Sequence, residues 1–166
     1  MKRVTPGFRA SLGDAGGKMV ASVLSLVAIV LMVKGYRSAE VVMLWNPPPA
    51  MIHVNNLLML LAVWLLNLGA SRGVLRTRLR HPMLTSVILW ALAHLMVNGD
   101  LASVILFGGI GVWAVVDMVM INRMQREWVR PVAGPVKNDL IYAAISLVLF
   151  GAIAWVHTWL NYWPFG

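Results

Sequence analysis

Four histidines are the residues of this sequence whose side chains could hold a metal or a cofactor. They are His53, His81, His94 and His157, and the chain has no cysteine. A neutral imidazole can bind haem iron, zinc or copper. The lack of cysteine excludes disulfides, thiolate metal sites, iron–sulfur clusters and covalently attached haem. His94 has the most apolar surroundings in the sequence, because residues 92–96 are otherwise Leu, Ala, Leu and Met.

The composition shows which kind of structure must position these histidines. Of the 166 residues, 60% are apolar and only 12% are charged, against about 25% charged residues in a typical soluble domain. Such a chain has too little polar surface for a soluble domain and is far too apolar for a disordered one. The composition therefore indicates an integral membrane protein.

Long uncharged runs predict the membrane-spanning helices, since a span needs about 20 apolar residues. The expected spans are residues 19–36, 50–71, 82–97, 101–122 and 140–160. The prolines at 47–49 forbid an earlier start of the second span, and Pro82 suits the first turn of the third. The predicted fold is an all-α transmembrane bundle of about five helices, in a single domain over residues 1–166.

The basic residues predict the orientation of this bundle. Twelve of the 14 Lys and Arg residues lie in the N-terminal stretch, in the loop after the second span or in the loop after the fourth. The positive-inside rule then places the N-terminus in the cytoplasm and the C-terminus outside. Five α-helical spans suit a multi-pass protein of the inner membrane. The net charge of +8 then marks the cytoplasmic face and contact with anionic lipid, and it requires no nucleic acid.

This topology brings three histidines to a similar depth near the outer leaflet. His53 lies near the start of the second span, while His94 and His157 lie one turn before the ends of theirs. Facing helices could therefore offer imidazoles to a haem iron, or form a three-histidine zinc or copper site. His53 and His157 could equally lie at headgroup level. His81 is 13 residues from His94, about 20 Å along one helix, so both can bind one iron only if that helix breaks.

Other motifs are few. The nucleophile elbow, the P-loop, the H-E-x-x-H zinc motif and the G-x-G-x-x-G fingerprint are all missing. Gly108, Gly109 and Gly111 thin the fourth span and suit close packing of helices.

Several runs of residues resemble a known family of membrane proteins. The most specific are R-H-P-M at residues 80–83 and A-H-L-x-x-N-G-D at residues 93–100. Further matches are P-G-F-R at 6–9, K-G-Y at 34–36, L-W at 44–45, L-F-G-G at 106–109 and V-H-T-W-L at 156–160. On these motifs the chain resembles the NnrU family of bacterial membrane proteins over nearly its whole length.

The resemblance has implications for function, because that family is homologous to 15-cis-zeta-carotene isomerase. It implies an all-α membrane bundle and, in the isomerase, a b-type haem held by two histidines. One of these ligands matches His94. The other lies in a helix upstream of the segment that matches residues 6–9, so we expect this chain to lack the family's first helix. A partner for His94 would then come from His53, from His157 or from another chain, or the position would stay open to a gas such as nitric oxide.

Three functions follow as expectations. The first is a haem-dependent cis–trans isomerase for a hydrophobic polyene, such as a carotenoid, that reaches His94 from the bilayer. The second is a non-catalytic haem protein or nitric-oxide-responsive factor that supports denitrification, the process with which the NnrU family is associated. The third is a haem-free structural membrane protein whose histidines only pack. In each case the protein could form an oligomer. His81 is a weaker candidate ligand in the first two, since a helix start or a phosphate contact suits it better.

Overall fold

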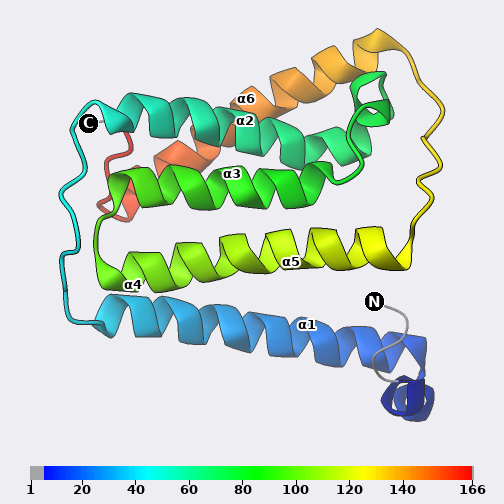
Figure 1. Cartoon of the computed structure of the whole chain (residues 1–166), viewed down its shortest axis with the longest axis horizontal. Helices are drawn as coiled ribbons and strands as arrows, with labels where there is room; N and C mark the ends of the chain where they lie inside the picture. The colour runs from blue at the N-terminus through cyan, green and yellow to red at the C-terminus, as the bar shows by residue number, and fades with distance from the viewer. Residues whose placement is uncertain (1–5, 166) are drawn as a thin grey trace. The chain divides into compact units, whose positions relative to one another are not determined.

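The computed structural model describes residues 6–165, and it describes side chains from residue 15 onward. The chain divides into two compact units, Met1–Glu40 and Val41–Gly166, which we describe separately (Figure 1). Helices make up nearly all of the regular structure, and among the described residues the only strand-like pairing is an isolated bridge between Met43 and Asp100. The predicted all-α fold is confirmed.

The first unit is one long helix, α1 (Pro6–Ser38). It begins 13 residues before the predicted start at residue 19. Pro6 occupies the first helical position, where its missing N–H costs nothing, and no later proline interrupts the helix. The part long and apolar enough to cross a membrane is Ala15–Ser38, so this span is longer than we predicted.

The second unit contains the remaining helices. They are α2 (Met51–Ser71), η1 (Leu75–Thr77), α3 (Pro82–Val97), α4 (Leu101–Ser103), η2 (Val104–Gly108), α5 (Gly109–Met124) and α6 (Val136–Trp159). The elements α4, η2 and α5 follow one another without a break and form one 24-residue span. The starts of α2 and α3 agree with the prolines at 47–49 and at 82. The helix α6 begins four residues earlier than predicted.

The four long helices of this unit form a row in the order α6, α2, α3, α5, with neighbours antiparallel (Figure 1). Small residues fill the contacts: Ala62 of α2, Ala91 and Ala93 of α3 and Ala114 of α5 are almost fully buried. A methyl group added to Gly111 would lie 3.1 Å from Cβ of Ala91. Small residues at these positions let the helix backbones approach closely, as is usual for helices packed in a membrane.

Among the residues that the structure describes, four helices are long and apolar enough to cross a membrane, with mean hydropathies between 1.7 and 2.3 over their best windows. Their large apolar side chains are mostly exposed, as expected where lipid covers them. The helix α3 is apolar but has only 16 residues, about 24 Å, less than a hydrocarbon core of about 30 Å. The third predicted span, residues 82–97, is therefore a short helix held between α2 and α5.

The two basic loops of this unit lie at the same end of the helix row (Figure 1). The guanidinium of Arg80 donates a hydrogen bond to the carbonyl of Gln125. The amide of Gly134 donates to the carbonyl of Gly73 at 3.5 Å. Eight of the 14 basic residues thus lie on or beside one end of this unit, as the charge pattern predicts; they are Arg72, Arg76, Arg78, Arg80, Arg123, Arg126, Arg130 and Lys137.

At the opposite end, the segment before α2 crosses the turn between α3 and α4. The carbonyl of Gly99 accepts hydrogen bonds from the amides of Leu44 at 2.8 Å and Trp45 at 3.1 Å. The amide of Leu101 donates to the carbonyl of Val42 at 2.9 Å. A side chain on Gly99 would place its Cβ only 1.9 Å from the carbonyl oxygen of Trp45. Glycine is therefore required at this crossing by the close approach of two backbones.

We expect Gly99→Ala to destabilise the protein by about 2 kcal/mol, in the usual range for overpacking, because a backbone carbonyl cannot move as a flexible side chain can. The measurement is the thermal unfolding midpoint in detergent. Gly151→Ala is the control, since nothing lies within 4 Å of a Cβ at that position. Equal midpoints for the two variants would show that the crossing is not tightly packed.

Candidate functional site: an aromatic cluster around His94

His94 lies in the last turn of α3, half-buried against two aromatic rings. Its ring centroid is 4.8 Å from that of Trp90 and 4.6 Å from that of Phe107. Trp90 and Phe107 also contact each other edge to face, at 5.1 Å. Three rings from two helices thus form one cluster, in which packing fixes the imidazole.

A hydrogen bond fixes the tautomer of His94. Its Nδ1 lies 2.8 Å from the carbonyl oxygen of Trp90. A carbonyl only accepts, so Nδ1 carries the proton and the lone pair of the neutral ring is on Nε2. Metal-binding histidines are usually oriented in this way, with the other ring nitrogen donating to a carbonyl or carboxylate. The geometry therefore leaves Nε2 as the atom that could bind a ligand.

The ring of Phe107 is brought to His94 by an irregular turn. Residues Val104–Gly108 form a π-helix inside the span that continues as α5. Such turns are rare and occur often at functional sites. The sequence predicted neither this turn nor the two aromatic partners of His94. The neighbouring glycines at 108, 109 and 111 were a signal of unusual backbone packing there, but they do not specify a π-helix.

The turn after His94 is held by polar side chains. The Asn98 amide donates to the carbonyl of His94 at 2.8 Å. Asp100 caps α4 by accepting from the amide of Ser103 at 2.9 Å and from its hydroxyl at 2.5 Å. The hydroxyl bond is the main cause that lowers the pKa of Asp100 below its usual value. A carboxyl group with a lowered pKa stabilises the folded state at pH values above its ordinary pKa. This stabilisation is lost as the pH falls through the lowered pKa. The cap is therefore charged at neutral pH.

The other histidines differ in their surroundings. His157 lies in the last turn of α6, and its Nδ1 is 2.8 Å from the carbonyl of Ile153, so its Nε2 is also left for a ligand. His53 is exposed in the first turn of α2. The first turn of α2 and the last turns of α3 and α6, which carry these three histidines, lie at the same end of the row (Figure 1).

His81 is at the other end of α3, next to the basic loops. Its Nε2 is 2.8 Å from Oδ1 of Asn122, and its carbonyl accepts from Thr85. The helix α3 runs unbroken from Pro82 to Val97. His81 and His94 therefore cannot bind one iron, and His81 is a helix-start residue as its position suggested.

The three histidines do not form a metal-ion site. No group of three or more His, Cys, Asp or Glu side chains that could hold a metal ion occurs among the residues that the structure describes. The described residues thus do not bring three histidines together as a zinc or copper site would require. A single axial position is what His94 can offer.

An apolar groove lies beside the aromatic cluster, between α3 and α5. Its volume is about 310 Å³. Phe107 contributes both to this groove and to the cluster around His94, and Leu95 lines it next to His94 in the chain. Gly108 and Gly111 form part of its wall, and their lack of a side chain leaves space in the groove. The groove can hold a slender hydrophobic molecule and offers it almost no polar partner.

The fold and the site together define a multi-pass, all-α membrane protein with one oriented histidine beside an apolar groove. Comparison with known proteins places this architecture in a family. The sequence matches the family described as NnrU protein over residues 1–164, and the chain belongs to that family. No significant match was found among curated proteins or among solved structures.

Proposed function

We propose that the protein binds b-type haem through Nε2 of His94. The observation that carries the proposal is the hydrogen bond from Nδ1 of His94 to the carbonyl of Trp90, because it fixes the tautomer that a haem ligand needs. The aromatic rings of Trp90 and Phe107 suit the flat apolar face of a porphyrin. Without cysteine in the chain, attachment would be non-covalent.

His157 is the best candidate for a second ligand from this chain. Its Nε2 is left unused by the hydrogen bond to Ile153, and it lies at the same end of the helix row as His94 (Figure 1). His53 is a weaker candidate because it is exposed and makes no hydrogen bond to a described residue through its ring. A partner chain could also supply the ligand.

For the activity we propose cis–trans isomerisation of a hydrophobic polyene, the reaction of the related zeta-carotene isomerase. The groove between α3 and α5 would hold the chain of conjugated double bonds and exclude water from it. Phe107 would contact both the polyene and His94. The haem, when bound, would supply an iron that can coordinate a double bond and lower the barrier to rotation.

Gly108→Leu tests the groove separately from the haem. A leucine there would fill the groove, and a Cβ at this position meets no atom within 4 Å. We expect the variant to lose conversion of tri-cis zeta-carotene by the reduced protein while it keeps its Soret band. Gly109→Leu is the matched control: its Cβ also meets nothing within 4 Å, and Gly109 does not line the groove. Absence of conversion by the wild-type protein would refute the isomerase.

A gas-binding role is the second candidate, because His94 would supply one axial ligand through Nε2 and this role needs no second histidine. A haem with one ligand from this chain has an open position for nitric oxide. In that case the reduced protein would bind nitric oxide with a shift of its Soret band and would leave the polyene unchanged. Such a protein would act as a haem factor in denitrification rather than as an enzyme.

We further propose that the protein lies in the inner membrane with the end that carries the basic loops in the cytoplasm. This proposal is supported by the eight basic residues on the loops at that end, because cytoplasmic loops carry an excess of Lys and Arg. The histidine end would then be near the outer face, with the N-terminus cytoplasmic and the C-terminus outside.

A further inference from the structure

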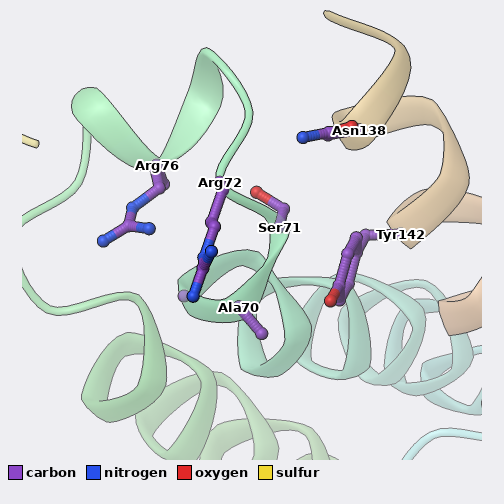
Figure 2. A pocket seen from close by; sticks show the side chains of 7 residues that line it. Ala70, Ser71, Arg72, Arg76, Asn138 and Tyr142 are labelled. Carbon is purple, nitrogen blue, oxygen red and sulfur yellow. The ribbon is translucent and has the colours of Figure 1, made fainter. Parts of the chain in front are cut away.

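A polar cavity of about 640 Å³ lies at the basic end of the second unit, away from the histidines. It is formed where α2 ends and α6 begins, and the loop with η1 covers one side. Its polar lining residues are Ser71, Arg72, Arg76, Asn138 and Tyr142. Figure 2 shows Arg72 and Arg76 extending in the same direction from the loop, with Tyr142 of α6 on the other side of Arg72. Side chains from two helices and one loop therefore converge on this cavity.

The cavity carries positive charge that the described residues do not neutralise. Neither Arg72 nor Arg76 forms an ion pair with any carboxylate in the part of the chain that the structure describes. Arg76 is half-buried, so water screens its charge less than at an open surface. Two guanidinium groups on one cavity repel each other, and an anion between them removes that cost. Guanidinium groups bind phosphate oxygens particularly well, because their donors can form two parallel hydrogen bonds.

The backbone around the cavity is fixed by Asp139, which is only 5% exposed. One carboxylate oxygen accepts from the amides of Val74 at 2.8 Å and Leu75 at 3.1 Å. The other accepts from the hydroxyl of Ser71 at 3.3 Å. Asp139 does not line the cavity, and its carboxylate oxygens accept from the loop and from Ser71. The Arg76 side chain therefore starts from a backbone that is already ordered.

Arg72 has a backbone conformation that is rare for a residue with a side chain. It ends α2 with φ of 50°, in the left-handed region. A glycine would adopt this conformation without strain. Residues held in such conformations occur preferentially at ligand sites. At this position the strained backbone directs a guanidinium toward the cavity (Figure 2).

The surroundings indicate which phosphate compound fits. Ser71 is the last residue of α2 and Asn138 lies in the first turn of α6, so the cavity is at the level where the spans end. Gly69 and Ala70, which also line it, are exposed on the span. Tyr142 is one turn deeper in α6 than Asn138, a depth at which tyrosine commonly meets lipid headgroups. A phosphodiester could lie between the arginines while its acyl chains follow this apolar surface into the bilayer.

We propose that this cavity binds a phosphate group, and that its source is the headgroup of an anionic phospholipid. Arg72 and Arg76 bind the phosphate oxygens. The Tyr142 hydroxyl and the Asn138 amide donate to the phosphate or glycerol oxygens. The site is independent of His94 and of the haem, since it lies at the opposite end of the helices.

Native mass spectrometry of the full chain tests the proposal. The protein is released from micelles that contain phosphatidylglycerol or, separately, phosphatidylcholine, and the retained lipid is counted. Each guanidinium near a membrane surface contributes about 1 kcal/mol of attraction to anionic lipid, or roughly a fivefold change in affinity. We therefore expect Arg76→Gln to retain about fivefold less phosphatidylglycerol, and Arg72→Gln/Arg76→Gln to lose most of it.

Arg78→Gln is the matched control, because Arg78 is in the same loop but is exposed and does not line the cavity. It removes the same charge and should retain lipid almost as the wild type does. Equal losses for Arg76→Gln and Arg78→Gln would overturn the proposal, since the attraction would then be a general effect of the basic face. Unchanged retention by the double variant, with an unchanged unfolding midpoint, would also overturn it.

Inorganic phosphate distinguishes the two sources of the ligand. Its effect on the thermal unfolding midpoint is measured in detergent without lipid, for the wild type and for the double variant. Stabilisation by phosphatidylglycerol and not by inorganic phosphate supports the lipid headgroup. Stabilisation by inorganic phosphate that is lost in the double variant supports the phosphate site. Stabilisation by inorganic phosphate together with equal retention of phosphatidylglycerol and phosphatidylcholine would overturn the assignment to lipid.

Discussion

His94→Ala is expected to abolish haem binding, so that the variant purified from cells supplied with haem has no Soret band. The reason is geometric: among the four histidines, His94 alone combines an apolar, half-buried site, two aromatic neighbours and an unused Nε2. Removing an axial ligand removes the iron–nitrogen bond, and hydrophobic contacts with two rings cannot replace it. The measurement is the absorption spectrum at equal protein concentration.

Two controls make this expectation specific. His81→Ala removes a histidine whose Nε2 is already bonded to Asn122 at the other end of α3, and it should keep the band. Adding imidazole to His94→Gly should restore the band, because the free ligand can occupy the space of the missing ring. A His94→Ala variant that keeps the full wild-type band would contradict ligation by His94.

Asp139→Ala is expected to have the largest effect on stability. The carboxylate is buried and accepts from two amides and one hydroxyl of the loop after α2. Each buried donor left without a partner costs about 1–3 kcal/mol, so we expect a loss of about 3 kcal/mol or more. The thermal unfolding midpoint in detergent measures it. Haem content per folded molecule should not change, since His94 is at the far end of the row (Figure 1).

The matched variant Asp139→Asn keeps one oxygen acceptor and should have an intermediate midpoint. Asp117→Ala is the control for loss of a carboxylate from a helix: Asp117 is half-buried in α5 and accepts no hydrogen bond from a described residue. It should unfold close to the wild type. If Asp139→Ala and Asp117→Ala have the same unfolding midpoint, Asp139 does not hold the loop. The account of the phosphate cavity then loses its support.

Much of the helical fold could be predicted from the sequence, because hydropathy and proline reveal where a span begins and ends. The starts of α2, α3 and α4 lie within one residue of their predicted positions. The start of α1 was missed because the helix continues through a stretch of glycine, alanine and charged residues that has no apolar periodicity. Low hydropathy there indicates the end of a membrane span and does not indicate the end of a helix.

The candidate site could be predicted only in part. The apolar neighbours of His94 in the chain indicated that it is buried, and the alternation of the spans correctly placed His53 and His157 at the same end. The contact with Phe107 depends on the π-turn at Val104–Gly108, which is set by packing between helices. The role of Asp139 was also missed, because its partners Val74 and Leu75 are more than 60 residues away in the chain and donate through backbone amides.

The haem content of the wild-type protein tests the central claim most directly. The full chain is purified in detergent from cells supplied with haem, and its haem is counted against its protein by the pyridine haemochrome spectrum. The account predicts a non-covalent b-type haem, close to one per chain, that acid acetone extracts. A preparation that is folded, as its thermal transition shows, and that takes up no haem even on titration would contradict it.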